Sequence, residues 1–132
     1  MTDRATLQAL IEQGYAARQK GDVEAILALF HPDGRFHLMG AAQFTPVCGL
    51  AAGQDALRAA MGGLVAGFAF LQRDIVSLLI DGEQAAVHSH VTLRAVASDK
   101  TVTTDILDLW KFRDGKILEL VEFADTALIN SL

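Results

Sequence analysis

Four long strand-like runs follow one another in the second half of the chain, and this arrangement limits the possible folds more than any other feature. The runs cover residues 68–80, 85–97, 101–113 and 116–123. Three short turn signals separate them, namely Asp81-Gly82, Ser98-Asp99 and Asp114-Gly115. Such turns are typical of β-hairpins, so the pattern predicts an antiparallel meander. Strands of this length must coil, which gives the sheet a concave face on which we expect a cavity.

The first part of the chain has helical periodicity instead. A helix is predicted over residues 2–20, because a single helical face carries Leu7, Leu10, Ile11, Gly14 and Arg18. Gly21 is expected to end this helix, and Asp22 to cap the next one. The second helix should stop before Pro32, since the residue before a proline disfavours helical dihedrals. Its apolar stripe is Val23, Ile26, Leu27 and Phe30.

A short strand over residues 35–39 should link this second helix to a loop over residues 41–53 and then to a third helix. The loop contains turn residues and no period, and we expect it to lie over the mouth of the pocket, where it could act as a lid. The apolar face of the third helix is Ala56, Leu57, Ala60, Met61 and Leu64, and the glycines that should fray its end are Gly62, Gly63 and Gly67. Helices followed by an antiparallel meander indicate an α+β fold. We expect a single domain over residues 1–132.

The composition is rich in apolar residues for a chain of 132 residues. The hydrophobic fraction is 52%, which a membrane segment, a lined pocket or a buried oligomer face would each explain. A membrane span needs roughly 20 consecutive apolar residues, and the richest stretch, residues 49–71, is interrupted by Gln54, Asp55 and Arg58. Asp3 and Arg4 likewise interrupt any signal peptide. We therefore expect a cytoplasmic protein with an apolar pocket that also forms dimers.

The charges argue against nucleic acid as a partner. The net charge is −5, and the 11 basic residues are scattered among 16 acidic ones, so no basic stripe is available to neutralise phosphates. The single cysteine, Cys48, excludes an internal disulfide and is expected to be a small buried apolar residue. No motif implies a metal or an organic cofactor.

Three segments carry a resemblance to a known superfamily. They are GDVEAILALFHPDGRF at residues 21–36, DLWKFRDGKILEL at 108–120 and VEFADTAL at 121–128. Together they resemble the SnoaL-like polyketide cyclases and the ketosteroid isomerases of the nuclear-transport-factor-2-like (NTF2-like) group. The resemblance implies a cone-shaped fold in which N-terminal helices pack on a curved antiparallel sheet and enclose a pocket. It does not fix a function, because this group includes isomerases, cyclases, epoxide hydrolases, dehydratases and binding modules.

The resemblance can be followed residue by residue. The aspartate base of ketosteroid isomerases corresponds here to Leu38, so the base is missing. Their oxyanion-binding tyrosine corresponds to Gly14, with Tyr15 next to it. Their neutral aspartic acid is matched by Asp108. Only one of these three catalytic positions is matched, which argues against a true steroid isomerase. SnoaL-like cyclases place an acid–base aspartate late in the chain, which implies a role for Asp125 or Glu122.

Strand alternation sorts the remaining candidates by face. In residues 85–94 the set expected to face the cavity is Val87, Ser89, Val91 and Leu93, and the outward set is His88, His90, Thr92 and Arg94. The spacing of His88 and His90 could hold a metal, although a metal site usually needs a third ligand. The favoured interpretation is a dimer interface on the outer face of the sheet. His37 should point away from the pocket if Leu38 points into it.

Asp108 and Glu122 are the strongest catalytic candidates. Asp108 shares a face with Thr104, Ile106 and Trp110, and Glu122 shares a face with Leu118, Leu120 and Ala124. The two strands are neighbours across Asp114-Gly115, so we hypothesise that both carboxyls lie in one pocket and divide the roles of acid and base. Alternatively, one of them faces solvent or simply bonds an Arg or Tyr. Asp125 either reaches the pocket mouth or caps a short helix over residues 126–130.

The sequence favours a small enzyme that moves protons on an apolar carbonyl compound by isomerisation, cyclisation or hydration–dehydration. Asp108 would be the acid or hydrogen-bond donor and Glu122 the base, with Asp125 as a further catalytic candidate. The expected pocket residues are Tyr15, Phe30, Leu38, Leu57, Met61, Ser89, Val91, Leu93, Trp110 and Leu120. Two alternatives remain: a non-catalytic protein that binds a small apolar ligand, and a dimeric interaction module.

Overall fold

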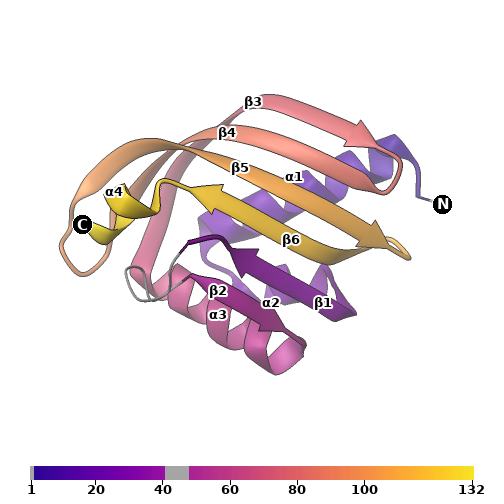
Figure 1. The fold of residues 1–132 in the computed structure, drawn as a ribbon, viewed down its shortest axis with the longest axis horizontal. Coiled ribbons are helices and arrows are strands. Elements are labelled where there is room, and N and C mark those ends of the chain that lie inside the picture. Colours follow the sequence, from indigo (N-terminus) through magenta and orange to yellow (C-terminus); the bar gives the residue numbers. More distant parts are fainter. Residues whose placement is uncertain (1, 41–47) are drawn as a thin grey trace.

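A computed structural model describes residues 2–40 and 48–132, and these form four helices and six strands (Figure 1). The helices are α1 (Arg4–Lys20), α2 (Val23–Ala28), α3 (Gln54–Gly67) and α4 (Thr126–Asn130). The strands are β1 (Phe30–Leu38), β2 (Gly49–Ala52), β3 (Phe68–Asp81), β4 (Gln84–Ala95), β5 (Thr101–Arg113) and β6 (Lys116–Ala124). The predicted α+β class is confirmed.

All six strands belong to one curved sheet with the order β2-β1-β6-β5-β4-β3. The four predicted strands, β3 to β6, form the antiparallel meander. β1 joins it parallel to β6, and β2 pairs antiparallel with β1, so the sheet is mixed. In Figure 1, β3 to β6 lie in front of α1, and α4 lies where β6 ends. Helices packed on one side of a curved sheet agree with the expected cone-shaped fold.

Local capping sets the ends of the first two helices. The Asp3 carboxylate accepts the Thr6 N–H at 2.8 Å, and Asp22 accepts the Ala25 N–H at 3.1 Å. Gly21 adopts φ 71°, a left-handed conformation that suits glycine at a helix C-terminus. The predicted starts of α1 and α2 therefore rest on ordinary capping chemistry.

Phe30 does not belong to the second helix, as the sequence predicted, but opens β1. The helix ends at Ala28, and the Leu29 carbonyl accepts the Ile117 N–H of β6 at 2.9 Å. Phe30 then pairs with Ile117 across the parallel ladder. This pairing satisfies backbone groups that the helix leaves open, so β1 begins five residues before the predicted residue 35.

The predicted loop over residues 41–53 is partly wrong. Gly49–Ala52 forms β2 because its backbone pairs with the open edge of β1. Cys48 is buried, and its Sγ donates to the Met39 carbonyl at 3.6 Å. Residues 41–47, on which the lid prediction mainly depends, lie outside the described residues.

The third helix is longer than predicted and continues through its glycines to Gly67. Three of its side chains, Leu57, Met61 and Leu64, are buried against the rest of the core. Tertiary packing on this face outweighs the low helix propensity of glycine, which costs about 1 kcal/mol per residue.

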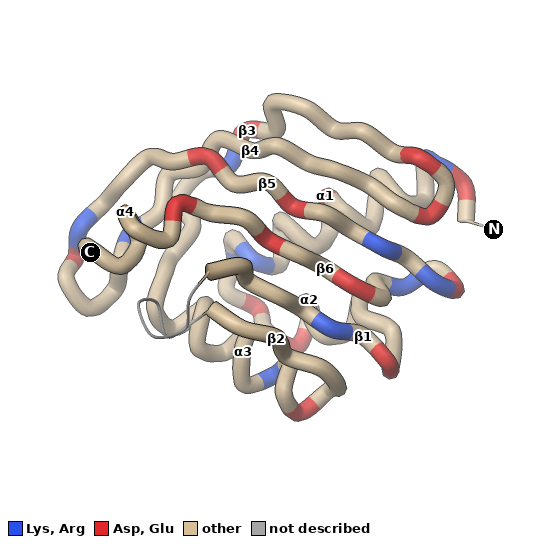
Figure 2. The backbone as a smooth tube through the Cα atoms, viewed as in Figure 1, with Lys and Arg blue, Asp and Glu red and all other residues tan. Residues whose placement is uncertain are grey.

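Charged positions are spread over the whole chain. Figure 2 shows Lys and Arg interspersed with Asp and Glu along the backbone. Within residues 2–40 and 48–132, no helix is both long and apolar enough to cross a membrane. In the same part of the chain, no group of three or more His, Cys, Asp or Glu side chains is placed to hold a metal ion.

Candidate functional site

A cavity of about 50 Å³ lies between the helices and the concave face of the sheet. Most of its lining is apolar, but it also contains Tyr15, Arg18, Arg73, Asp108 and Glu122. The other lining residues are Gly14, Ile26, Leu29, Phe30, Phe36, Met61, Leu64, Phe70, Trp110, Ile117 and Leu120. Five ionisable side chains in one apolar cavity make it the candidate site.

A second cavity of about 30 Å³ adjoins the first. Both cavities are lined by Arg18, Leu64, Phe70 and Glu122. The second one continues toward the C-terminus, where Ile129 of α4 contributes to its wall. Glu122 and Arg18 therefore stand at the boundary between two small chambers.

Asp108 is fully buried at the centre of β5. Its Oδ2 accepts a hydrogen bond of 2.7 Å from the Tyr15 hydroxyl of α1. Nη1 of Arg73 lies 3.8 Å from the same oxygen. Oδ1 is also buried and has no hydrogen-bond partner among the described residues. A buried carboxyl with one oxygen unsatisfied is a costly arrangement that a bound ligand would relieve.

Glu122 is the direct cross-strand neighbour of Asp108 in the β5–β6 ladder. In the β1–β6 ladder the same residue pairs with Leu38, the position that corresponds to the missing isomerase base. Both carboxyls line the first cavity. The hypothesis that Asp108 and Glu122 lie together is supported by this register.

Burial raises the pKa of Asp108 well above its ordinary value, and the neighbouring Glu122 charge raises it further. The Arg73 charge and the Tyr15 hydrogen bond act in the opposite direction but are weaker. Burial also raises the pKa of Tyr15, and the Asp108 charge adds to that effect. The pair is therefore arranged as a neutral phenol beside a carboxyl that holds its proton to higher pH.

Arg73 enters the cavity because of a β-bulge in β3. Phe70 pairs with Leu93 and Gln72 pairs with Thr92, so Leu71 is an extra residue in the strand. The bulge reverses the alternation that follows it, and Arg73 faces inward opposite the buried Val91.

Arg18 is held in place by backbone carbonyls. Its Nη2 donates to the Leu64 carbonyl at 3.1 Å and to the Phe68 carbonyl at 2.8 Å, and its guanidinium lies 4.3 Å from the centre of the Phe70 ring. Burial lowers its pKa to about 10, which leaves it charged at neutral pH. Arg18 thereby connects α1 to the junction of α3 and β3.

The predicted pocket residues divide into three groups. The residues that line the first cavity are Tyr15, Phe30, Met61, Trp110 and Leu120, together with Asp108 and Glu122. Those on the second cavity are Leu38 and Leu93, again with Glu122. Three further residues are fully buried but are not among those that line either cavity, namely Leu57, Ser89 and Val91.

One strand face was assigned incorrectly at its start. Leu118 was expected to share the inward face of β6, but Ile117 is the buried residue. The register shifts between Lys111 and Phe112, so Phe112 pairs with Ile117. This irregularity lets both Ile117 and Leu120 face the core.

Asp125 lies past the end of β6 and caps α4. Its Oδ1 accepts the Leu128 N–H at 3.0 Å, and the residue is exposed. Of the two roles considered for Asp125, the structure shows the capping contact. His37 is half-buried, whereas its neighbour Leu38 is buried.

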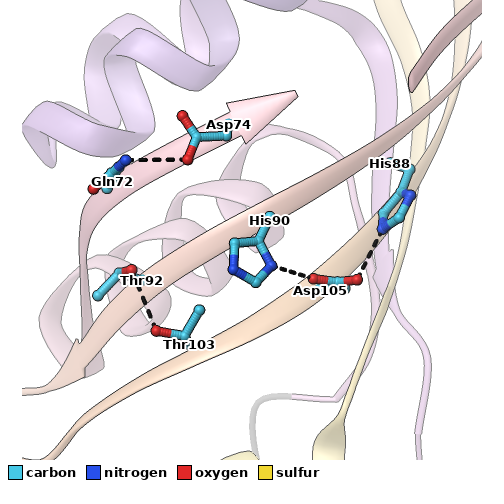
Figure 3. Close-up of polar contacts among 7 residues, drawn as sticks. All are labelled: Gln72, Asp74, His88, His90, Thr92, Thr103 and Asp105. Atoms are coloured by element: carbon cyan, nitrogen blue, oxygen red, sulfur yellow. Dashed lines mark hydrogen bonds and ion pairs between the residues drawn. The ribbon is translucent and has the colours of Figure 1, made fainter. Parts of the chain in front are cut away.

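The two histidines of β4 lie on the outer face of the sheet, as strand alternation predicted. Asp105 bridges them, with Oδ2 at 3.0 Å from His88 Nε2 and Oδ1 at 2.6 Å from His90 Nδ1 (Figure 3). Figure 3 also shows the Gln72–Asp74 contact and the Thr92–Thr103 contact around them. Hydrogen bonds from both rings lower the pKa of Asp105.

Arg18, Arg73 and Phe70 are site residues that sequence reasoning missed. A signal for Arg18 was present, because it lies on the same helical face as Leu7, Leu10 and Ile11. An arginine on an apolar helical face needs a buried partner. The sequence contains no comparable signal for Arg73, since regular alternation of side chains along the strand from Phe70 places Arg73 on the outer face.

The comparisons with known proteins agree with this architecture. The profile of the SnoaL-like domain family matches residues 11–120. Among functionally curated proteins, no sequence matches the chain. An NTF2-like protein of unknown function from Burkholderia pseudomallei is 19% identical with a TM-score of 0.83, covering 100% of this chain and 98% of that one.

Two further solved structures share the fold. A protein named as an isomerase of Rhodopseudomonas palustris is 14% identical with a TM-score of 0.82, covering 99% of this chain and 98% of that one. TerC, co-crystallised with polyporic acid, is 21% identical with a TM-score of 0.80, covering 96% of this chain and 97% of that one. At these identities the likeness establishes the fold alone. Since the profile spans most of the sequence, the chain belongs to the SnoaL-like domain family, and its fold is NTF2-like.

Proposed function

We propose that this protein is an enzyme that transfers protons on a small carbonyl compound bound in the cavity, with Asp108 as the acid and Glu122 as the base. The observation that carries the proposal is the cross-strand pairing of these two carboxyls, one of them fully buried and bonded to Tyr15. Burial raises the pKa of Asp108, which suits this carboxyl to the role of acid.

The proposed reaction begins with the substrate carbonyl oxygen beside Asp108 and Tyr15. Glu122 removes a proton from the α-carbon: the C–H bond breaks, an O–H bond forms on Glu122, the C–H electron pair forms a C=C bond, and the carbonyl π pair moves to oxygen. That oxygen accepts a hydrogen bond or the proton from Asp108. In a β,γ-unsaturated substrate, return of the proton from Glu122 to the γ-carbon gives isomerisation; attack of the enol carbon on a second carbonyl of the substrate, whose oxygen takes up a proton, gives cyclisation.

The size of the cavity restricts the substrate. About 50 Å³ is well below the roughly 300–1,000 Å³ of drug-sized ligand sites. We therefore propose a small substrate, or a larger one whose reacting end alone enters this chamber. Relatives of the same fold support a small-molecule site, since they include a protein named as an isomerase and TerC with polyporic acid.

The test is deuterium exchange at the α-carbon of acetone, cyclohexanone and pyruvate in deuterium oxide, followed by NMR. We expect the wild type to accelerate exchange for at least one compound, and Asp108→Asn and Glu122→Gln to lower the rate about 100-fold or more. Matched controls lie on the same strands and the opposite face: Asp105→Asn on β5 and Glu119→Gln on β6 should retain the rate. If the wild type accelerates no exchange, or if both site variants retain it, the proposal is wrong and a binding function is favoured.

We further propose that the protein forms a homodimer through the outer face of the sheet. Leu107, Leu109 and Phe123 are each about 40% exposed there, with values of 39%, 41% and 40%. Leu107 and Phe123 are direct cross-strand neighbours. Adjacent exposed apolar side chains on one sheet face are typical of protein interfaces.

A further inference from the structure

The guanidinium of Arg73 lies close to two aromatic rings inside the candidate site. Its central carbon lies 3.9 Å from the centre of the Tyr15 ring and 5.0 Å from that of Phe70. The side chain is only 6% exposed. Cation–π contacts with two rings in a buried position restrict the guanidinium before any ligand binds.

One of these N–H groups is left without a hydrogen bond. Nη1 of Arg73 is buried and has no hydrogen-bond partner among the described residues. The nearest carboxylate oxygen, Oδ2 of Asp108, is 3.8 Å away, beyond the usual limit of about 3.2 Å for such a bond. That oxygen already accepts the Tyr15 hydroxyl. A buried cationic donor without an acceptor is costly, and an acceptor brought by a ligand would remove the cost.

The other polar groups of the cavity also favour an acceptor-rich ligand. Nε1 of Trp110 is a second buried donor on the same cavity, with no hydrogen bond of good geometry among the described residues. It is already near the Tyr15 hydroxyl, because a side-chain hydrogen bond from Trp110 lowers the pKa of Tyr15. Arg18 already donates to two carbonyls. Arg73 is therefore the cationic donor of the chamber that most needs an acceptor.

The charged side chains that face the cavity also favour an anionic ligand. They are two guanidiniums, Arg18 and Arg73, and two carboxyls, Asp108 and Glu122. Burial and the Glu122 charge raise the pKa of Asp108, which weakens its ability to balance the two guanidiniums. A single anionic group on the ligand would supply the missing negative charge.

We propose that Arg73 binds a carboxylate of the substrate, which makes the substrate a small oxo acid. The carboxylate takes the open edge of the Arg73 guanidinium, and the carbonyl lies toward Tyr15 and Asp108. The inference about the carbonyl depends on the proposed function, whereas the binding of a carboxylate by Arg73 does not require turnover. Arginine suits this role because its planar fork matches the two oxygens of a carboxylate.

The experiment is a titration of the purified protein with three carboxylates, acetate, isobutyrate and benzoate, and with their neutral amides. Trp110 is the only tryptophan of the chain, so its single indole N–H resonance reports on the cavity. We expect at least one carboxylate to shift this resonance and to bind about tenfold or more tightly than its amide. Equal binding of acid and amide, or no response to any carboxylate, would overturn the proposal.

Variants separate this role from a structural one. Arg73→Met should bind the carboxylate and its amide equally, whereas the control Arg94→Met, on the outer face of β4, should keep the preference. If Arg73→Met does not fold, Arg73→Lys, which keeps the charge but loses the fork, should show a weakened preference. Asp108→Asn should abolish α-carbon exchange and keep the carboxylate preference, so failure of the catalytic proposal and failure of the binding proposal give different results. A preference that persists in Arg73→Met would also overturn the proposal.

Discussion

The Tyr15 hydroxyl donates a 2.7 Å hydrogen bond to Oδ2 of Asp108 and thereby joins α1 to β5 across the cavity. Tyr15 is the residue after Gly14, the position that corresponds to the isomerase tyrosine. Gly14 itself packs on the indole of Trp110, where a Cβ would lie 3.2 Å from Cη2. The phenol therefore reaches the buried carboxyl from the neighbouring position on the helix.

Replacement of Tyr15 by Phe should destabilise the protein and perturb Asp108. Loss of the hydrogen bond leaves a buried carboxyl oxygen without its donor, which should lower the free energy of unfolding by about 1–3 kcal/mol. The pKa of Asp108 should rise further, because the Tyr15 hydrogen bond is one of the two influences that lower it. Urea unfolding and carbon-13 NMR of the Asp108 carboxyl measure the two effects. An unchanged stability together with an unchanged pKa would contradict this account.

Replacement of Glu122 by Gln should shift Asp108 in the opposite direction. The Glu122 charge is the second-largest cause of the raised pKa of Asp108, after burial. Its removal should lower the pKa of Asp108 while leaving it above the ordinary value, since burial is unchanged. The same carboxyl resonance reports the shift, and Glu119→Gln is the control on β6. A pKa that does not fall would mean that the two carboxyls are not electrostatically coupled.

Much of the fold could be predicted because its determinants are local. Asp3, Gly21 and Asp22 set helix ends by capping, and the turns at Gly82, Asp99 and Gly115 adopt the positive φ angles of 61°, 60° and 71° that such residues tolerate. The pairing of β1 with β6 and of β2 with β1 could not be predicted. These ladders join segments far apart in sequence, and no local sequence pattern indicates which edge strand a distant segment will pair with.

The candidate site was also predictable only in part, but for a different physical reason. The pairing of Asp108 with Glu122 follows from the length of one hairpin and the alternation of its strands. The inward position of Arg73 depends on a bulge at Leu71, which exchanges the two faces of β3 as far as a second bulge at Val76. A bulge of this kind leaves no periodic signal, because the residues on either side of it still alternate.

Asp125 should prove to be a structural residue. Its carboxylate caps α4, so Asp125→Ala should lower the free energy of unfolding by about 1 kcal/mol, and Asp125→Asn should largely retain stability. Neither change should alter α-carbon exchange at saturating substrate. Thermal unfolding and the exchange assay test both statements. A loss of exchange in Asp125→Asn without a loss of stability would instead assign Asp125 to the catalytic machinery.

A charge on the outer face of the sheet should separate the proposed dimer. Leu109→Glu places a carboxylate on this face, opposite Val121 in the β5–β6 ladder. It should convert a dimer to a monomer, as measured by native mass spectrometry and light scattering. Ala16→Glu, on the exposed surface of α1, adds the same charge elsewhere and should leave the dimer intact. A wild-type protein that is monomeric at all concentrations would contradict the proposal directly.

Asp108 should also make the stability of the protein depend on pH with a predictable sign. Its pKa is raised in the folded state above the ordinary value of 3.8. Below about pH 4, both the folded and the unfolded chain hold the proton, and the contribution of Asp108 to stability is fully present. As the pH rises, the unfolded chain releases the proton first, so this contribution falls by up to about 1.4 kcal/mol per pH unit until the folded pKa is passed. Asp108→Asn has no proton to release, so its free energy of unfolding relative to the wild type should increase with pH above about 4. Urea unfolding at several pH values measures this difference.

Asp105→Asn is the matched control with the opposite sign, because the folded pKa of Asp105 is lowered and its contribution to stability is lost as the pH falls. Parallel pH profiles for Asp108→Asn and the wild type would show that the Asp108 carboxyl ionises in the folded protein as it does in water.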